Sequence, residues 1–253
     1  DYGLYVGKYL VVCGIVTALV RIAVLPVIAR IFQCFKRDEN RFARTVFQSG
    51  VHIGLVHGIF LAVFVAVMGE QIADLLHPVN AQTAARMLRQ GSALIVLVPL
   101  CGYFRRLLHA MGKKYSVLAA ACGADVVFSI AVLAGMGKAG VLSLVYGGLA
   151  AGGVLCVVLG VFAYRQMRVQ PDWLGTFAIP LGAGGVAGLI CLLMRKLFAA
   201  RLGSLAMLLV ALAVAGLIYW ILLLLLRNFK EQELEVVPGG RLIGRLGQLL
   251  RIF

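Results

Sequence analysis

The chain has 253 residues, of which 62% are hydrophobic and 13% are charged. A soluble domain typically carries about 25% charged residues, so this composition excludes a water-soluble globular fold. The formal net charge is +14, but the lysines and arginines stand between apolar runs rather than in one basic domain. Such a distribution is typical of the basic residues that flank membrane helices, and it argues against nucleic-acid binding.

Apolar runs long enough to cross a bilayer recur along the chain. The runs are continuous and do not alternate with polar residues, which favours helices over a β-barrel. Since a spanning helix needs roughly 20 apolar residues, we predict an all-α integral membrane protein with about seven transmembrane helices. In chain order, the expected spans are 3–29, 48–76, 91–110, 115–136, 140–164, 176–197 and 203–226.

The last stretch, 229–253, is predicted to be a cytoplasmic hinge and tail outside the transmembrane part, 1–228. Residues 230–235 are mostly polar, and Pro238 and two glycines follow. From Arg241 to Phe253, leucine and isoleucine recur at helical intervals with arginines away from that stripe. This pattern predicts an amphipathic helix lying on the membrane surface.

The basic residues favour one side of the membrane. Most of them fall in every second connection, and the positive-inside rule places those connections and the C-terminus in the cytoplasm. With an odd number of spans, residue 1 is then expected outside. Because the sequence begins at Asp1 without a signal peptide, we expect an N-terminal portion to precede it.

Two cations in the first apolar run are candidate substrate-binding residues. Insertion of a charged side chain at the centre of a span costs about 2.5–3.5 kcal/mol. Arg21, which lies shortly before Pro26, is therefore expected to have a compensating interaction or a function. It could line a polar cavity and pair with an anionic substrate, or its side chain could snorkel to the cytoplasmic interface. Lys8 lies near the outer end of the run, where snorkelling alone would account for it.

Other polar residues give no indication of an enzyme. Asp125 is the acidic residue near the middle of a span; it could relay a proton, bind a coupling cation, or neutralise Arg21 or another basic group. His52 and His57 do not share a helix face well, so packing is expected rather than metal binding. No catalytic triad or metalloprotease motif occurs, and no cofactor is expected.

Small residues are dense in two of the later spans. The pairs Gly148/Gly152 and Gly184/Gly188 have the G-x-x-x-G spacing that allows helix backbones to approach closely. The six cysteines lie mostly in apolar runs without a C-x-x-C pair. They are expected to be small buried residues rather than disulfides or metal ligands.

Several short motifs follow one another along the chain. Val24 to Arg30 reads V-L-P-V-I-A-R, Leu107 to Lys114 reads L-L-H-A-M-G-K-K, and Gly135 to Gly140 reads G-M-G-K-A-G. In this order they resemble the L-P-x-x-S element, the "l-q-A-x-G-k" turn and the G-x-x-G hairpin of the lipid-linked oligosaccharide flippases in the multidrug/oligosaccharidyl-lipid/polysaccharide (MOP) exporter superfamily. The segment Glu231 to Pro238 is similar to the end of the stage V sporulation protein B branch.

The resemblance covers essentially the whole chain, as spans eight to fourteen of a fourteen-span protein. It implies the C-terminal lobe, plus two extra helices, of a MATE/MOP-type transporter. The implied function is a flippase that moves an undecaprenyl-pyrophosphate-linked oligosaccharide, such as lipid II or a polysaccharide repeat unit, by alternating access. The implied partners are that lipid-linked sugar, membrane lipids and an N-terminal half of the transporter. The implied location is the bacterial cytoplasmic membrane.

The resemblance also bears on individual residues. Residues 5–8, Y-V-G-K, match a Y-A-D-R element whose cation faces the cavity, with Lys8 in place of arginine; lysine lacks the bidentate fork that arginine offers to pyrophosphate. Ala29 replaces the serine of L-P-x-x-S, and Asp125 stands where the family tends to carry asparagine or another polar residue. Along a helix Lys8 and Arg21 would be roughly 20 Å apart, so they would act at different depths.

Three other functions stay open at this point. A cation-coupled multidrug exporter of the same superfamily would need coupling acids, and Asp125 favours it. A membrane glycosyltransferase would need a large outer loop, whereas the longest outer connection expected here is only 77–90. A scaffold for cell-wall synthesis that transports nothing is the third alternative.

Overall fold

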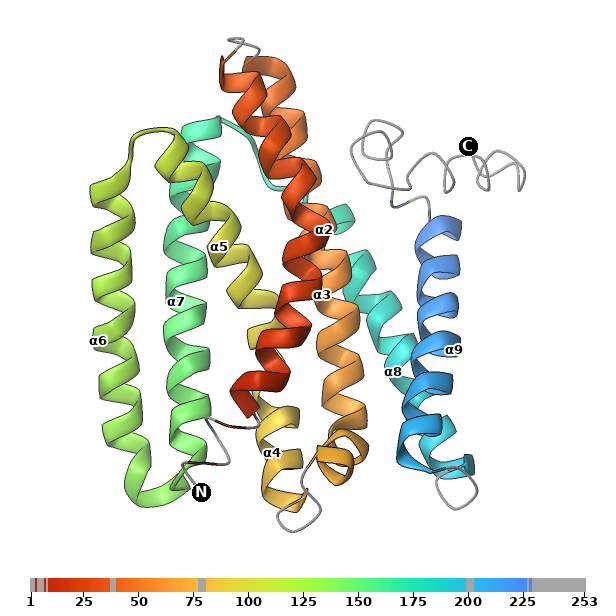
Figure 1. Cartoon of the computed structure of the whole chain (residues 1–253). Helices are drawn as coiled ribbons and strands as arrows, with labels where there is room; N and C mark the ends of the chain where they lie inside the picture. Colours follow the sequence, from red (N-terminus) through yellow and green to blue (C-terminus); the bar gives the residue numbers. More distant parts are fainter. Residues whose placement is uncertain are drawn as a thin grey trace.

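The computed structural model describes residues 3, 7, 9–36, 40–76, 81–198, 203–226 and 228. Throughout this part the chain is helical, without β-strands (Figure 1). A π-helical turn, η3, leads directly into α8. In chain order the elements are α2 (Leu10–Lys36), α3 (Asn40–Leu76), α4 (Ala81–Gly91), α5 (Leu94–Ala110), α6 (Lys114–Ala139), α7 (Leu142–Met167), η3 (Leu174–Ala178), α8 (Ile179–Phe198) and α9 (Ser204–Leu225).

The helices have the length and surface of membrane spans. Among the described residues, six helices are long and apolar enough to cross a bilayer, and seven if the bent pair α4–α5 counts as one span. Large apolar side chains cover their outer surfaces: on α6, Leu133 is 74% exposed, and on α9, Leu217 is 62% exposed. Hydrocarbon is the favourable surrounding for such a surface. The prediction of an all-helical, multi-pass membrane protein with about seven spans is confirmed to this extent.

The boundaries differ from the prediction in the first half of the chain. α2 continues through Pro26 to Lys36 instead of ending near residue 29, because a membrane helix tolerates proline where its neighbours compensate for the lost hydrogen bond. α3 begins at Asn40, before the expected 48, and its first turns bury Val46 and Phe47. The later spans lie within a few residues of their expected positions.

The expected third span, 91–110, corresponds to α5, and a short helix, α4, precedes it. α4 and α5 meet at an angle of 46°, and α4 occupies a stretch that was expected to be a loop. This short helix is amphipathic: Ala84, Met87 and Leu88 are buried, whereas Arg86 and Arg89 are exposed. The helix Ala81–Gly91 is too short and too polar to cross a bilayer by itself, and it lies at one end of the bundle, next to α3 (Figure 1).

α3 is the central helix. It packs against α2, α4, α5, α8 and α9, and in Figure 1 it lies between the α2–α5 side and the α8–α9 side. In its most apolar stretch 67% of the residues are buried, against 17–33% in the other spanning helices. Most of the surface of the other helices is therefore exposed, whereas protein surrounds α3.

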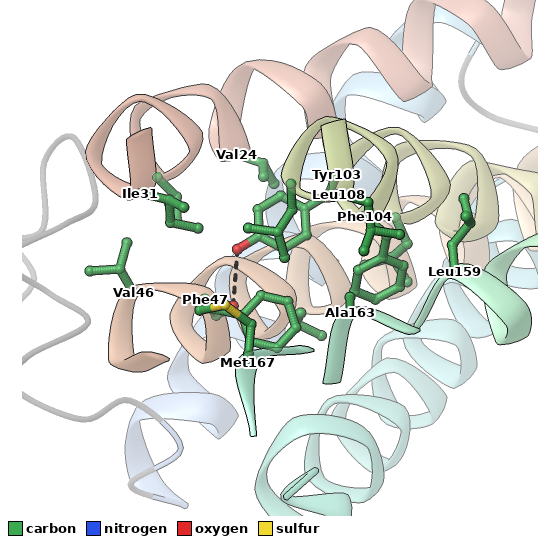
Figure 2. Packing of buried hydrophobic residues seen from close by; sticks show 14 of the residues in the cluster. Val24, Ile31, Val46, Phe47, Tyr103, Phe104, Leu108, Leu159, Ala163 and Met167 are labelled. Carbon is green, nitrogen blue, oxygen red and sulfur yellow. Dashed lines mark hydrogen bonds between the residues drawn. The ribbon is translucent and has the colours of Figure 1, made fainter. Parts of the chain in front are cut away.

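The main apolar cluster joins α2, α3, α5 and α7 (Figure 2). Phe47 of α3 lies at its centre, stacked on Tyr103 with ring centroids 6.0 Å apart and edge-on to Tyr164 at 5.0 Å. The Tyr103 hydroxyl donates a hydrogen bond to the Phe47 carbonyl oxygen at 3.0 Å. A second hydroxyl, that of Tyr219 on α9, donates to the Val56 carbonyl oxygen at 2.7 Å. In both tyrosines the buried hydroxyl group is thus satisfied by a backbone carbonyl oxygen of α3.

The glycine pairs allow the close helix contacts that their spacing predicts. On α8, a Cβ atom at Gly184 would lie 2.9 Å from Ile59 Cγ2, and one at Gly188 would lie 2.8 Å from Val63 Cγ1. On α7, Cβ atoms at Gly148 and Gly152 would lie 3.4 and 3.3 Å from methyl carbons of Leu94. The first pair leaves no room for a side chain against α3, and the second pair leaves little against α5.

The α3–α8 contact can be tested with two alanine variants. Gly188→Ala should lower the melting temperature in detergent, because overpacking of this kind costs about 1–3 kcal/mol. The matched control is Gly182→Ala on the same helix, where no atom lies within 4 Å of the added Cβ. There, alanine should be neutral or stabilising because it is the better helix former. Equal melting temperatures for the two variants would contradict the close contact.

Candidate functional site

A cleft of about 310 Å³ lies between α2, α5, α6 and α7. Three arginines line it: Arg21 from α2, and Arg105 and Arg106 from α5. Most of the remaining lining side chains are apolar or small. They are Val24, Ile28, Val98, Pro99, Cys101, Gly102, Tyr103, Val117, Ala121, Gly152, Leu155 and Leu159.

Helical periodicity explains how each helix contributes to the cleft. On α2, Arg21, Val24 and Ile28 follow the i, i+3, i+7 spacing of one face. On α5 the same spacing brings Val98, Cys101 and Arg105 to the cleft, and Pro99, Gly102 and Arg106 lie beside them. Gly102 adds no side chain, and no atom lies within 4 Å of the place that its Cβ would take, which leaves open space beside α5.

The cleft is electropositive. Its described lining contains three guanidinium groups and no carboxylate, and within the described part of the chain none of the three arginines forms an ion pair. A positive charge among apolar walls attracts an anion more strongly than the same charge in water. Because a guanidinium presents a planar fork of donors, it suits phosphate and carboxylate oxygens.

Arg21 is the predicted site residue that the structure places in the cleft. Sequence reasoning assigned Arg105 and Arg106 only to the basic, cytoplasmic side of the membrane and missed their grouping with Arg21. One signal was available: both lie before the helix end at Ala110, inside the expected span 91–110. Their proximity to Arg21 depends on the packing of α2 against α5, which the sequence does not reveal.

The two other predicted site residues, Asp125 and Lys8, are not among the described residues that line the cleft. Asp125 is exposed on α6, one turn beyond Ala121, and is not among the residues that line the cleft. In the described part of the chain it forms no ion pair with Arg21. Its roles in coupling or charge pairing stay predictions. Lys8 lies outside the described residues.

A second group of charges lies at the other end of α3. The two carboxylate oxygens of Glu70 lie 2.9 Å from an Arg89 nitrogen and 3.1 Å from an Arg195 nitrogen, so Glu70 joins α3 to α4 and α8. Although Glu70 is 49% exposed, it is therefore not simply solvated. Asp74 and Arg86 lie around the same open cavity of about 470 Å³. Charges of both signs line this cavity, so it has no preference for an anion.

The histidines and cysteines have mostly structural surroundings. His57 Nδ1 lies 2.9 Å from the Ile53 carbonyl oxygen, and its ring lies edge-on to Trp220 at 5.3 Å. Cys122 is exposed, contrary to the expectation of burial, and Cys101 Sγ donates to the Gly152 carbonyl oxygen at 3.6 Å. Within the described ranges, no three histidine, cysteine or acidic residues are grouped to hold a metal ion.

The fold and the cleft define a class: an all-helical chain with six or seven potential membrane spans and an arginine-lined cleft between four of its helices. No family model, no curated protein and no solved structure matches this chain. The resemblance of its motifs to the lipid-linked oligosaccharide flippases therefore stays a prediction.

Cysteine labelling tests whether the cleft is an aqueous, anion-attracting space. In a variant whose own cysteines are replaced by alanine or serine, Ala121→Cys should react with a negatively charged methanethiosulfonate. It should react more slowly with a positively charged one, by about tenfold or more, because the three arginines concentrate anions. Reaction rates are measured with the protein in lipid vesicles.

Leu118→Cys is the matched control for this labelling. Leu118 is 60% exposed on the same helix but does not line the cleft, so hydrocarbon should shield a cysteine there from both reagents. Equal, slow labelling at the two positions would mean that the cleft is not an aqueous space. Faster labelling of Ala121→Cys by the cationic reagent would contradict its positive potential.

Proposed function

We propose that this chain forms the C-terminal lobe of a MATE/MOP-type flippase that moves an undecaprenyl-pyrophosphate-linked oligosaccharide across the bacterial cytoplasmic membrane. The observation that carries the proposal is the convergence of Arg21, Arg105 and Arg106 on one cleft. The order of motifs along the chain supports the same family. Lipid II and polysaccharide repeat units are the substrates of this class.

The physical problem of such a substrate is its headgroup. A pyrophosphate cannot cross hydrocarbon unaided, because transferring an unpaired charge out of water is very costly. A cleft that supplies cations replaces part of the lost hydration, while the polyprenyl tail stays in the bilayer. The three arginines supply that charge, and the apolar walls formed by α6 and α7 keep it in a surrounding of low polarity.

The size of the cleft fits the headgroup rather than the entire substrate. About 310 Å³ is at the lower limit of a small-molecule site, roughly 300–1,000 Å³. It can hold a pyrophosphate, whereas the sugars would extend toward a second lobe. Arg105 and Arg106 lie near the end of α5 that precedes the basic turn at Lys113 and Lys114. By the positive-inside rule this end is cytoplasmic, so we place the first headgroup contact on that side.

The alternative transporter is less well supported. A cation-coupled exporter of cationic drugs would need a carboxylate facing the substrate. The described lining of the cleft contains none, and Asp125 lies outside it. A scaffold that transports nothing would not need three arginines to converge on one cleft, and an assay of lipid II binding separates it from a flippase.

The test uses the complete protein that contains this sequence, in cells depleted of their own lipid II flippase. Surface exposure of lipid II is scored at matched expression. Wild type should restore exposure, and Arg21→Ala and the double variant Arg105→Ala/Arg106→Ala should each reduce it by tenfold or more. This magnitude follows because a charge-assisted hydrogen bond contributes about 1.5–3 kcal/mol. Lys8→Ala tests the predicted second cation.

Two further variants serve as controls. Arg86→Ala removes an exposed arginine of α4 that does not line the cleft, so it should leave flipping unchanged. Arg21→Lys keeps the charge but loses the fork, so it should give an intermediate rate. Failure of well-expressed wild type to restore exposure would refute lipid II as the substrate. Full activity of the Arg105→Ala/Arg106→Ala variant would refute the role of the cleft.

A further inference from the structure

Two cysteines face each other where α5 packs against α7, at the wall of the cleft. The close contacts between the two helices set their register. A Cβ atom at Gly152 would lie 3.6 Å from Leu97 Cδ1, and one at Gly160 would lie 3.3 Å from Phe104 Cε2. The contacts advance in the same direction along both helices, so α5 and α7 are parallel. One helical turn after the Leu97–Gly152 contact, Cys101 therefore stands opposite Cys156.

The side chains of Cys101 and Cys156 are in contact. Cys101 Sγ donates to the Gly152 carbonyl oxygen at 3.6 Å, and Gly152 lies one turn before Cys156 on α7. The two cysteine side chains are also hydrogen-bonded to each other. Both cysteines are free, so the fold holds two thiols side by side that belong to different helices.

The surroundings of the pair favour thiol chemistry. Cys101 lines the cleft and is 8% exposed, whereas Cys156 is partly exposed and follows Leu155 of the cleft lining. Three arginines and no carboxylate belong to the described lining of that cleft. Neighbouring cations stabilise a thiolate, which is the reactive form of cysteine. A small oxidant can therefore reach Cys156, with Cys101 next to it.

We propose that Cys101 and Cys156 form a redox-active pair that a peroxide oxidises to a disulfide. Cys156, the more exposed thiol, reacts first. Its thiolate attacks one oxygen of hydrogen peroxide, the O–O bond breaks, and the hydroxide that leaves takes up the thiol proton to give water. The sulfur of Cys101 then attacks the sulfenic sulfur of Cys156, and the hydroxyl group leaves with the Cys101 proton as a second water molecule. The two thiols lose two electrons and two protons, and the peroxide is reduced to water.

The disulfide ties α5 to α7 beside the arginines of the cleft. Because Arg105 and Arg106 follow Cys101 on α5, the cross-link fixes these arginines relative to α7. A thiol reductant reverses it by thiol–disulfide exchange. The proposal does not depend on the flippase function, since the reaction needs only the thiol pair and its access to peroxide.

Mass spectrometry of the purified full chain tests the pair. After treatment with hydrogen peroxide and alkylation of the remaining thiols, a cross-linked peptide that contains Cys101 and Cys156 should appear, and dithiothreitol should remove it. In Cys101→Ser, dimedone should trap a sulfenic acid on Cys156. In Cys156→Ser, the more buried Cys101 should react with peroxide more slowly, by about tenfold or more. Cys191→Ser removes a buried cysteine of α8 and should leave the rate of cross-linking unchanged.

The melting temperature in detergent is a second measurement. A disulfide between distant segments restricts the unfolded chain, so peroxide should raise the melting temperature of wild type, and dithiothreitol should restore the original value. In Cys101→Ser, peroxide should cause no rise. The measurements on wild type need no variant, so a misfolded variant does not affect them. Two free thiols after peroxide treatment of folded wild type would overturn the proposal. Equally fast cross-linking in urea-unfolded protein would also overturn it, because native packing would then not bring the thiols together.

Discussion

The packing of the whole bundle depends on the burial of α3 among its neighbours. In hydrocarbon a polar group cannot turn to water, so a hydroxyl inside the bundle must find a protein partner. Tyr103 and Tyr219 meet this requirement on carbonyl oxygens of α3, from α5 and from α9 respectively. Each bond fixes how its helix is rotated and where it lies along α3. Two groups of helices are thereby positioned separately, one on each side of the central helix.

The cleft follows from the arrangement on one of these sides. α6 packs mainly against α7, and its contact with α5 is slight, so the space between α5 and α6 is not filled by interlocking side chains. Gly102 and Ala121 add little or no side chain to it. Arginines in such a space face an opening rather than a tightly packed core. This combination suits reversible binding of an anion better than it suits structural stabilisation.

Much of the fold could be predicted from the sequence, and less of the site. The positions of α6, α7 and α9 follow from the lengths of their apolar runs, because hydrocarbon thickness sets the length of a span. The passage of α2 through Pro26 could not be foreseen, since neighbouring helices decide whether proline ends a helix. Residues on all sides of α6 are apolar, so no pattern shows that the cleft ends before it reaches Asp125. The grouping of Arg21 with Arg105 required the packing of two distant segments.

The break between α4 and α5 separates the end of the bundle that holds α4 from the arginines near the other end of α5. At this break, α4 is held to α3 through Glu70 and Arg89, and the Gly91 carbonyl oxygen accepts a hydrogen bond from Tyr9 at 3.3 Å. From the start of α5 to Arg105 the helix is roughly 17 Å long, so a tilt of about 10° at the break displaces that arginine by about 3 Å. A displacement of that size is enough to break a hydrogen bond between Arg105 and a ligand. A tilt at the break would thus move Arg105 most, and it would have to break the hydrogen bond by which Tyr103 fixes α5 on α3.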